Sequence, residues 1–208
     1  MRIRRASTYR RMPWKNGGGE TIEIMTSPDG AALDAFDWRL SMAHVSRAGP
    51  FSLFPEIDRT LSVIAGAGLR LTVGAYPPVN LGPTSTPFSF RGDIATDCTL
   101  IDGPIDDLNV MTRRDHCRHR VARHQMTEPL NLRWQGNVAI GIPIGNNVTV
   151  AAAGETILLS GKDTVEFDRN AARACVVTPH GDCDFFLIEI WQPDAATALP
   201  GQKLPEKR

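Results

Sequence analysis

Short apolar runs, separated by turns rich in glycine and proline, recur along almost the whole chain. The sequence has 18 glycines and 15 prolines among its 208 residues, and they lie between the runs rather than in one low-complexity tract. Residues 69–73 alternate as a half-buried strand does, and residues 185–191 have the composition of a core strand. Long stretches with a helical period are missing from the sequence. Strand-like segments at a spacing of about 8 to 12 residues predict an all-β sandwich or barrel.

The second half of the chain repeats this pattern from about residue 121 onward. Apolar segments at 138–140 and 148–150 precede a Gly-Lys-Asp turn and a further segment at 165–167. We therefore expect two similar halves in a single compact body, with residues 1–115, including the glycine-rich motif at 14–19, in the first and residues 116–208 in the second. A hydrophobic content of 42% is ordinary for a globular protein of a size that can bury a sizeable core.

The net charge, the basic patches, the apolar runs and the cysteine spacing limit which partners and which cellular compartment we expect for this protein. The formal net charge is zero, and the two basic patches, at 2–15 and 113–124, have neither a recognisable reading helix nor interleaved stacking aromatics. We therefore favour solvated or interface strands there over nucleic-acid binding. No apolar run reaches the roughly 18 residues that a membrane span needs, and the four cysteines form no CxxC pair. We expect no membrane partner, a reducing compartment and a cytoplasmic location.

The stretch from residue 39 to residue 73 has the spacing of the cupin metal motif without its ligands. That motif places two histidines around one residue, then a glutamate, then a glycine; here these places hold Ser52, Phe54, Arg59 and Gly66. Divalent cations bind imidazole, thiolate or carboxylate groups, whereas a guanidinium repels a cation and offers two parallel donors to a carboxylate. The motif therefore predicts no metal, and it predicts anion binding through Arg59.

Alternation places further polar side chains on shared strand faces. Arg39 and Ser41 lie two residues apart, so they share a face with Ala43, either inside a barrel or on a solvated exterior. Asp107 and Asn109 likewise share a face, which either orients a ligand or closes a turn. Both interpretations of each pair stay open at the level of sequence.

The cluster Asn16-Gly17-Gly18-Gly19 has two interpretations, a backbone nest for an anion or a tight turn into the first long strand. We favour the turn, with Trp14 and Asn16 facing the mouth of the cavity. His116, Cys117 and His119 are three metal-binding residue types within four positions, but the arginines around them oppose a cation. No nucleophile motif such as Gly-x-Ser-x-Gly is present.

Five motifs in a fixed order carry a family resemblance. They are MPWKNGGGET at 12–21, DWRLS at 37–41, GPFSLFP at 49–55 with Asp58 and Arg59, FRGD at 90–93, and DGPIDDLNVM at 102–111 with Arg113 and Arg114. From about residue 8 to residue 190 the chain resembles the HutD/Ves family. The resemblance implies a bicupin fold, a cytoplasmic bacterial protein and, for the HutD branch, a role in histidine utilisation. Glu56 departs from the glycine that is frequent at its place in the family.

These observations together predict a metal-free bicupin, built from two cupin-type double-stranded β-helices, that binds a small carboxylate metabolite without a cofactor. The expected ligand-binding residues are Trp14, Asn16, Arg39, Ser41, Ser52, Phe54, Arg59, Asp107 and Asn109. Through the resemblance, urocanate and N-formylglutamate are candidate ligands of a regulator. The alternatives are an isomerase, hydrolase or lyase that uses Asp107 or His44 as a base, and a structural interaction module. A homodimer is compatible with each of them.

Overall fold

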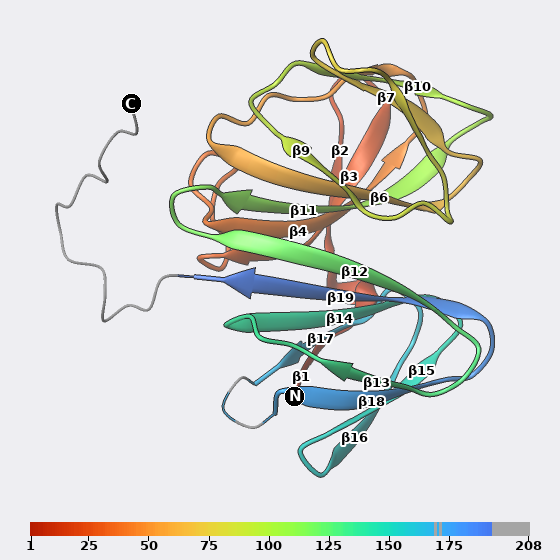
Figure 1. Cartoon of the computed structure of the whole chain (residues 1–208). Helices are drawn as coiled ribbons and strands as arrows, with labels where there is room; N and C mark the ends of the chain where they lie inside the picture. The colour runs from red at the N-terminus through yellow and green to blue at the C-terminus, as the bar shows by residue number, and fades with distance from the viewer. Residues whose placement is uncertain (169, 171, 193–208) are drawn as a thin grey trace, which may run out of the picture.

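Four antiparallel sheets, two in each half, form a pair of stacked barrels in the computed structural model (Figure 1). The structure describes residues 1–168, 170 and 172–192. In this part of the chain the single helix is the 3-10 turn η1 (Ala6–Thr8). The described residues contain no helix with the length and apolar character needed to cross a membrane. The predicted all-β class is confirmed.

The first barrel pairs a six-stranded sheet with a four-stranded sheet. The larger sheet has, in spatial order, β2 (Arg10–Pro13), β3 (Gly19–Ser27), β4 (Trp38–Val45), β11 (Ile105–Arg113), β6 (Ile57–Ala65) and β9 (Phe88–Arg91). The smaller sheet has β5 (Gly49–Pro50), β10 (Thr96–Leu100), β7 (Leu69–Val73) and β8 (Val79–Leu81). The predicted strand at 69–73 is therefore β7.

The second barrel has the same plan with a five-stranded and a four-stranded sheet. The larger sheet has β1 (Arg2–Arg4), β17 (Thr164–Phe167), β14 (Val138–Gly145), β19 (Cys183–Trp191) and β12 (Arg118–Met126). The smaller sheet has β13 (Leu130–Arg133), β18 (Ala174–Pro179), β15 (Val148–Ala152) and β16 (Glu155–Leu159). The core strand predicted at 185–191 lies within β19.

Three large apolar clusters hold the barrels together, and a fourth, smaller one consists of Phe36, Ile57 and Met111. One fills the first barrel and includes Leu61, Leu69 and Leu71. A second fills the second barrel, and a third lies between the two large sheets, where residues such as Leu40 and Leu108 meet Ile142 and Phe186 of the other barrel. The central strands are buried on both faces, one against the other barrel and one inside their own. The side chains of these strands that face the other barrel, such as Leu40 of β4, Leu108 of β11 and Phe186 of β19, are therefore apolar.

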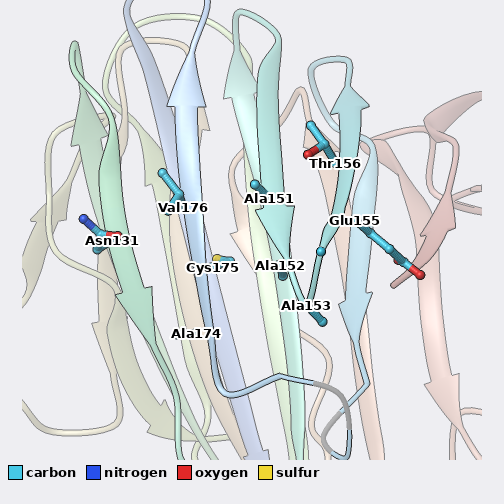
Figure 2. Close-up of a pocket in the computed structure, with 10 residues that line it drawn as sticks. Asn131, Ala151, Ala152, Ala153, Glu155, Thr156, Ala174, Cys175 and Val176 are labelled. Atoms are coloured by element: carbon cyan, nitrogen blue, oxygen red, sulfur yellow. The ribbon is translucent and has the colours of Figure 1, made fainter.

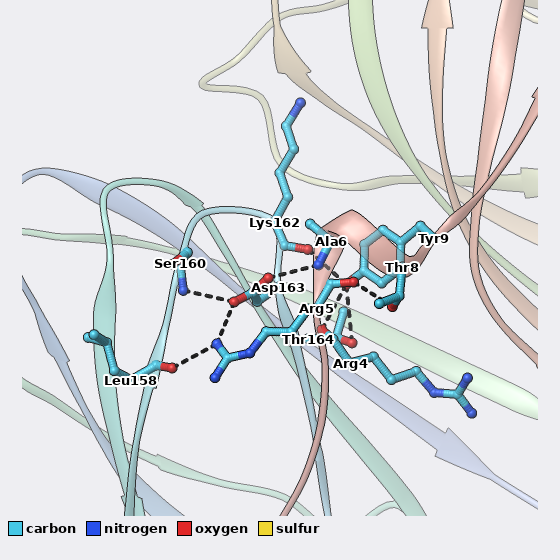
Figure 3. A network of polar contacts seen from close by, with 10 residues as sticks. All are labelled: Arg4, Arg5, Ala6, Thr8, Tyr9, Leu158, Ser160, Lys162, Asp163 and Thr164. Atoms are coloured by element: carbon cyan, nitrogen blue, oxygen red, sulfur yellow. Dashed lines mark hydrogen bonds and ion pairs between the residues drawn. The ribbon is translucent and has the colours of Figure 1, made fainter.

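The chain start crosses from one barrel to the other. The boundary expected at 115/116 falls in the turn between β11 and β12, but residues 2–4 do not lie in the first half, since β1 pairs with β17 through Arg2↔Glu166 and Arg4↔Thr164. Buried Asp163 holds this segment by accepting hydrogen bonds from the Ala6 N–H (2.8 Å) and the Arg5 guanidinium (2.7 Å) (Figure 3). The sequence pattern missed this exchange because three residues are too few to show a period.

Candidate functional site

Polar side chains from neighbouring strands of the large sheet lie side by side in the interior of the first barrel. β11 lies between β4 and β6, and its register aligns Met111 with Arg39 and Arg59, then Asn109 with Ser41 and Leu61. The next row aligns Asp107 with Ala43 and Val63. Directly opposed residues share a sheet face, and the aligned Leu61, Ala43 and Val63 belong to the core of this barrel. The polar side chains in these rows therefore point inward.

Four charged groups lie in this interior. Arg39 makes an ion pair with Glu23 of β3 through its Nε at 2.9 Å; the Arg39 side chain is buried and that of Glu23 is mostly buried. The guanidinium of Arg59 donates from Nη2 to Oδ1 of Asn109 at 2.9 Å. The Nδ2 of Asn109 then donates to Oδ1 of Asp107 at 2.5 Å. The solvated-exterior interpretation of Arg39 and Ser41 is wrong, and so is the turn interpretation of Asp107 and Asn109.

Aromatic rings surround the Arg59 guanidinium. Its central carbon lies 5.0 Å from the ring centre of Phe51, 5.6 Å from that of Phe54 and 5.2 Å from that of Phe90, distances at which a cation is attracted to the ring faces. Only 7% of Arg59 is exposed. Its Nε is buried without a hydrogen-bond partner among the described residues. A buried donor without a partner is costly in a folded protein, and here it belongs to a guanidinium that lies among three phenylalanine rings.

Burial changes the acid–base behaviour of the two charged ends of this network. It lowers the pKa of Arg59 to about 10, so the side chain remains a cation at neutral pH. It also raises the pKa of Asp107 to about 7, and the charge of Arg59, the backbone of Ala43 and the amide of Asn109 only partly oppose this rise. Asp107 therefore exchanges a proton near neutral pH.

Two of the predicted site residues lie away from this array. Ser52 is exposed in the loop between β5 and β6, because that segment leaves the barrel wall before β6 begins. Asn16 is also exposed, and its Oδ1 caps the turn by accepting from the Gly18 N–H at 3.0 Å. That turn is closed by a Trp14 N–H bond to the Gly19 carbonyl, which agrees with the turn interpretation of the motif.

The other predicted residues reach the first barrel. Trp14 is half-buried, packs against the core of the first barrel and donates from its indole to Thr21 at 2.8 Å. Phe54 is half-buried beside Arg59. Pattern reasoning missed Glu23, Phe51 and Phe90 as parts of the array. The two phenylalanines belong to motifs of the family resemblance, and Glu23 belongs to a segment that alternates like a strand. The local sequence does not show, however, which strands will lie beside Arg39 and Arg59.

The residues present do not fit the divalent metal of a cupin motif. Exposed Ser52, aromatic Phe54 and cationic Arg59 occupy the ligand places. No group of three or more His, Cys, Asp or Glu side chains within 1–168, 170 and 172–192 could hold a metal ion.

The histidine-rich segment after β11 also makes separate contacts. His116 bonds Asp37 at 2.6 Å, Cys117 is buried in the cluster between the barrels, and His119 lies between the hydroxyls of Thr60 and Thr112, each at 2.7 Å. Burial raises the pKa of Cys117 to about 11 and lowers that of His119 to about 4. The three side chains therefore serve packing and local hydrogen bonding.

The interior of the second barrel is filled by apolar side chains. Phe185 packs directly over Gly141, where an added Cβ would lie 2.4 Å from the ring, and Trp134 stacks near Phe167 with ring centres 4.4 Å apart. An open depression of about 360 Å³ lies on β13, β15, β16 and β18 of this barrel (Figure 2). It is open, and its floor consists mainly of small side chains such as Ala151 and Val176. The buried array in the first barrel is the better candidate, because it concentrates unpaired charge and oriented donors.

Similar proteins agree with this architecture. The structure of a conserved protein of unknown function from Pseudomonas aeruginosa PAO1 matches with a TM-score of 0.84 and 31% identity, over 92% of this chain and 98% of that one. The structure of HutD from Pseudomonas fluorescens SBW25 matches with a TM-score of 0.78 and 36% identity, over the same shares of the two chains. A Bacillus subtilis oxalate decarboxylase matches at 10% identity with a TM-score of 0.62, which supports the cupin-type fold alone. The molecule is a bicupin.

Sequence relatives point the same way. An uncharacterized 21.2 kDa protein from the hutC 3′ region of Pseudomonas putida is 36% identical over 157 residues, which make up 76% of this chain and 80% of that protein. Protein Ves of Citrobacter koseri is 40% identical over 116 residues, 54% of this chain and 59% of Ves. The HutD family model matches residues 6–185. The chain belongs to the HutD family.

Proposed function

We propose that this protein binds a small carboxylate-bearing metabolite inside its first barrel, without a metal, and acts as a regulator in histidine utilisation. The family, the HutD of Pseudomonas fluorescens and the relative from a hutC region support the link to that pathway. Urocanate and N-formylglutamate are the candidate ligands. The likeness to Ves leaves room for a related acid as the natural ligand.

The observation that carries this proposal is the state of Arg59. The guanidinium is a buried cation that donates one hydrogen bond, to the neutral amide of Asn109, and within the described residues its Nε has no partner. A carboxylate satisfies a guanidinium through two parallel hydrogen bonds. The aromatic rings around Arg59 exclude water, which strengthens such a contact.

The neighbouring residues have distinct roles in this proposal. Asn109 fixes the orientation of Arg59, and the buried Ser41 beside it offers a hydroxyl to the ligand. Arg39 is held and neutralised by Glu23, so it is not a free clamp for the ligand. Phe54 and Trp14 contribute apolar surface to the wall of the proposed site.

The test is ligand binding to wild type and to Arg59 variants. Calorimetry or NMR titration would use urocanate, N-formylglutamate, glutamate and formate as probes. Arg59→Ala should weaken binding about tenfold or more, because a charge-assisted hydrogen bond contributes about 1.5–3 kcal/mol. Arg59→Lys should recover only part of the affinity, since a point charge cannot reproduce the two-pronged geometry.

Arg70→Ala is the matched control, because Arg70 is an exposed arginine on β7 of the same barrel. It should bind like wild type. Circular dichroism would establish that each variant is folded. Equal binding by wild type and a folded Arg59→Ala variant would make Arg59 a structural residue and end the proposal.

One observation favours an enzyme as the second candidate. Asp107 has a pKa of about 7, which suits a general acid or base, and it lies in the same interior. Its carboxylate is already engaged by Asn109, which makes it less available to a substrate. Turnover of any probe acid by wild type, lost in Asp107→Asn and detected by NMR of the reaction mixture, would favour the enzyme.

A further inference from the structure

The charges inside the first barrel are unevenly paired. Arg39 and Glu23 neutralise each other in direct contact. Arg59 and Asp107 are the remaining two, and among the described residues they are joined only through the Asn109 amide. With Asp107 ionised the interior is neutral, and with Asp107 protonated it carries one net positive charge.

Asp107 is surrounded by groups from several strands. Arg59 of β6 and Arg39 of β4 lie on the same interior face, with Glu23 of β3 beyond Arg39. Cys98 of β10 lies close enough for the charge of Asp107 to act on its thiol.

The neighbouring carboxylate, Asp106, also opposes ionisation of Asp107. Asp106 is itself held by His44 at 2.8 Å and Lys162 at 3.0 Å. Asp107 is only 1% exposed, so water cannot screen these interactions. Its charge therefore depends on what else enters the interior.

We infer that binding of a carboxylate at Arg59 is coupled to the uptake of one proton by Asp107. This inference rests on the proposed function and adds its regulation. The ligand brings a negative charge to the guanidinium that otherwise compensates Asp107. Two anions would then share one cation in a poorly solvated space, and such like charges favour protonation of one of them. The proton comes from solvent and joins a carboxylate oxygen of Asp107, and no other covalent bond changes.

Asp107 rather than the ligand accepts the proton because of their positions. The ligand carboxylate would contact the guanidinium directly, which favours its ionised form, whereas Asp107 reaches the same cation only through an amide. The consequence is that acid conditions strengthen binding. Above neutral pH the affinity should fall by up to about tenfold for each pH unit, as linkage to a single proton requires.

Formate is the probe of choice because it has one carboxylate, which stays ionised from about pH 6 to pH 9, and no other titrating group. The dissociation constant of formate would be measured by NMR titration across this range for wild type, Asp107→Asn and Asp106→Asn. In parallel, calorimetry in buffers with different ionisation enthalpies would count the protons taken up. Asp106→Asn is the control for loss of an adjacent carboxylate that has its own partners; because Asp106 opposes the ionisation of Asp107, this variant should move the pH dependence to lower pH without abolishing it.

We expect wild type and Asp106→Asn to bind formate more weakly as pH rises and to take up a fraction of a proton approaching one. Asp107→Asn should bind with no pH dependence and no proton uptake. Carboxyl-carbon NMR of wild type provides a check that needs no variant, because formate should shift one buried aspartate toward its protonated signal.

The outcomes separate the two ideas. Formate binding through Arg59 with no proton uptake in wild type would overturn this inference and leave the proposed function standing. Proton uptake that persists in folded Asp107→Asn would overturn it as well. If none of urocanate, N-formylglutamate, glutamate and formate binds to the wild type, the proposed function is wrong, and the inference that rests on it is wrong as well.

Discussion

Arg59 donates a hydrogen bond to Asn109 across 2.9 Å, and this contact fixes which way the Asn109 amide points. Because Oδ1 accepts from the guanidinium, Nδ2 is directed at the carboxylate of Asp107. A neutral side chain thus separates a buried cation from a buried acid. The cation keeps donors for a ligand, and the acid keeps a pKa close to neutrality.

Removing the bridging amide should destabilise the fold. Asn109→Ala leaves a buried guanidinium and a buried carboxylate each without one partner, and we expect a loss of about 2–4 kcal/mol in the free energy of unfolding. Urea denaturation measures it. Asn80→Ala, at an exposed position on β8, is the control and should change stability little. Similar values for both variants would show that the bridge contributes nothing to stability.

Asp107 should make the stability of the wild type depend on pH. Its pKa in the folded protein, about 7, lies above the usual aspartate value of 3.8, so protonation favours the folded state. This contribution is fully present below about pH 4 and is lost as pH rises to about 7. Asp107→Asn should remove that loss. Denaturant unfolding of both proteins at intervals from pH 4 to pH 8 checks this, and parallel stability curves would contradict it.

His119 should act in the opposite direction. Burial between the barrels lowers its pKa to about 4, so the folded state favours neutral imidazole. The stability that this supplies is present above about pH 6.5 and is lost as pH falls toward 4. Nitrogen-15 NMR of the imidazole should show no protonation of His119 between pH 8 and pH 5.5, with the signal assigned by its absence in His119→Gln. A midpoint near pH 6.5 would contradict the burial seen here.

Glu56 occupies a left-handed backbone conformation, with φ of 62°. A side chain there costs about 1 kcal/mol relative to glycine, and its nearest ion pair, with Arg113 at 3.8 Å, is exposed and weak. Glu56→Gly should therefore raise the free energy of unfolding by up to about 1 kcal/mol. Glu128→Gly is the contrast, because Glu128 is exposed but has an ordinary φ, and it should lose stability or stay unchanged. A loss in Glu56→Gly equal to that in Glu128→Gly would remove the strain argument.

The family resemblance had marked the same position. The sequence departs there from a frequent glycine, and the structure shows the backbone conformation that glycine adopts most readily. Gly66, the one residue of the cupin spacing that is retained, has φ of 87°, and an added Cβ would lie 2.4 Å from the Pro104 carbonyl oxygen. Conformational demands of this kind can be inferred from sequence because they concern single residues.

The sequence alone determined the β class and the pairs of side chains that share a face, such as Arg39 with Ser41 and Asp107 with Asn109, whereas the doubled barrel was implied by the family resemblance. Alternation along a strand suffices for these, because its period is a property of the backbone. Tertiary structure decided which face turns inward and which strands become neighbours. Glu23 meets Arg39, and β1 joins the second barrel, through pairings between segments that no local pattern connects. Ser52 stays outside for the same reason, because its motif spacing fixes a position along the chain and not a direction in space.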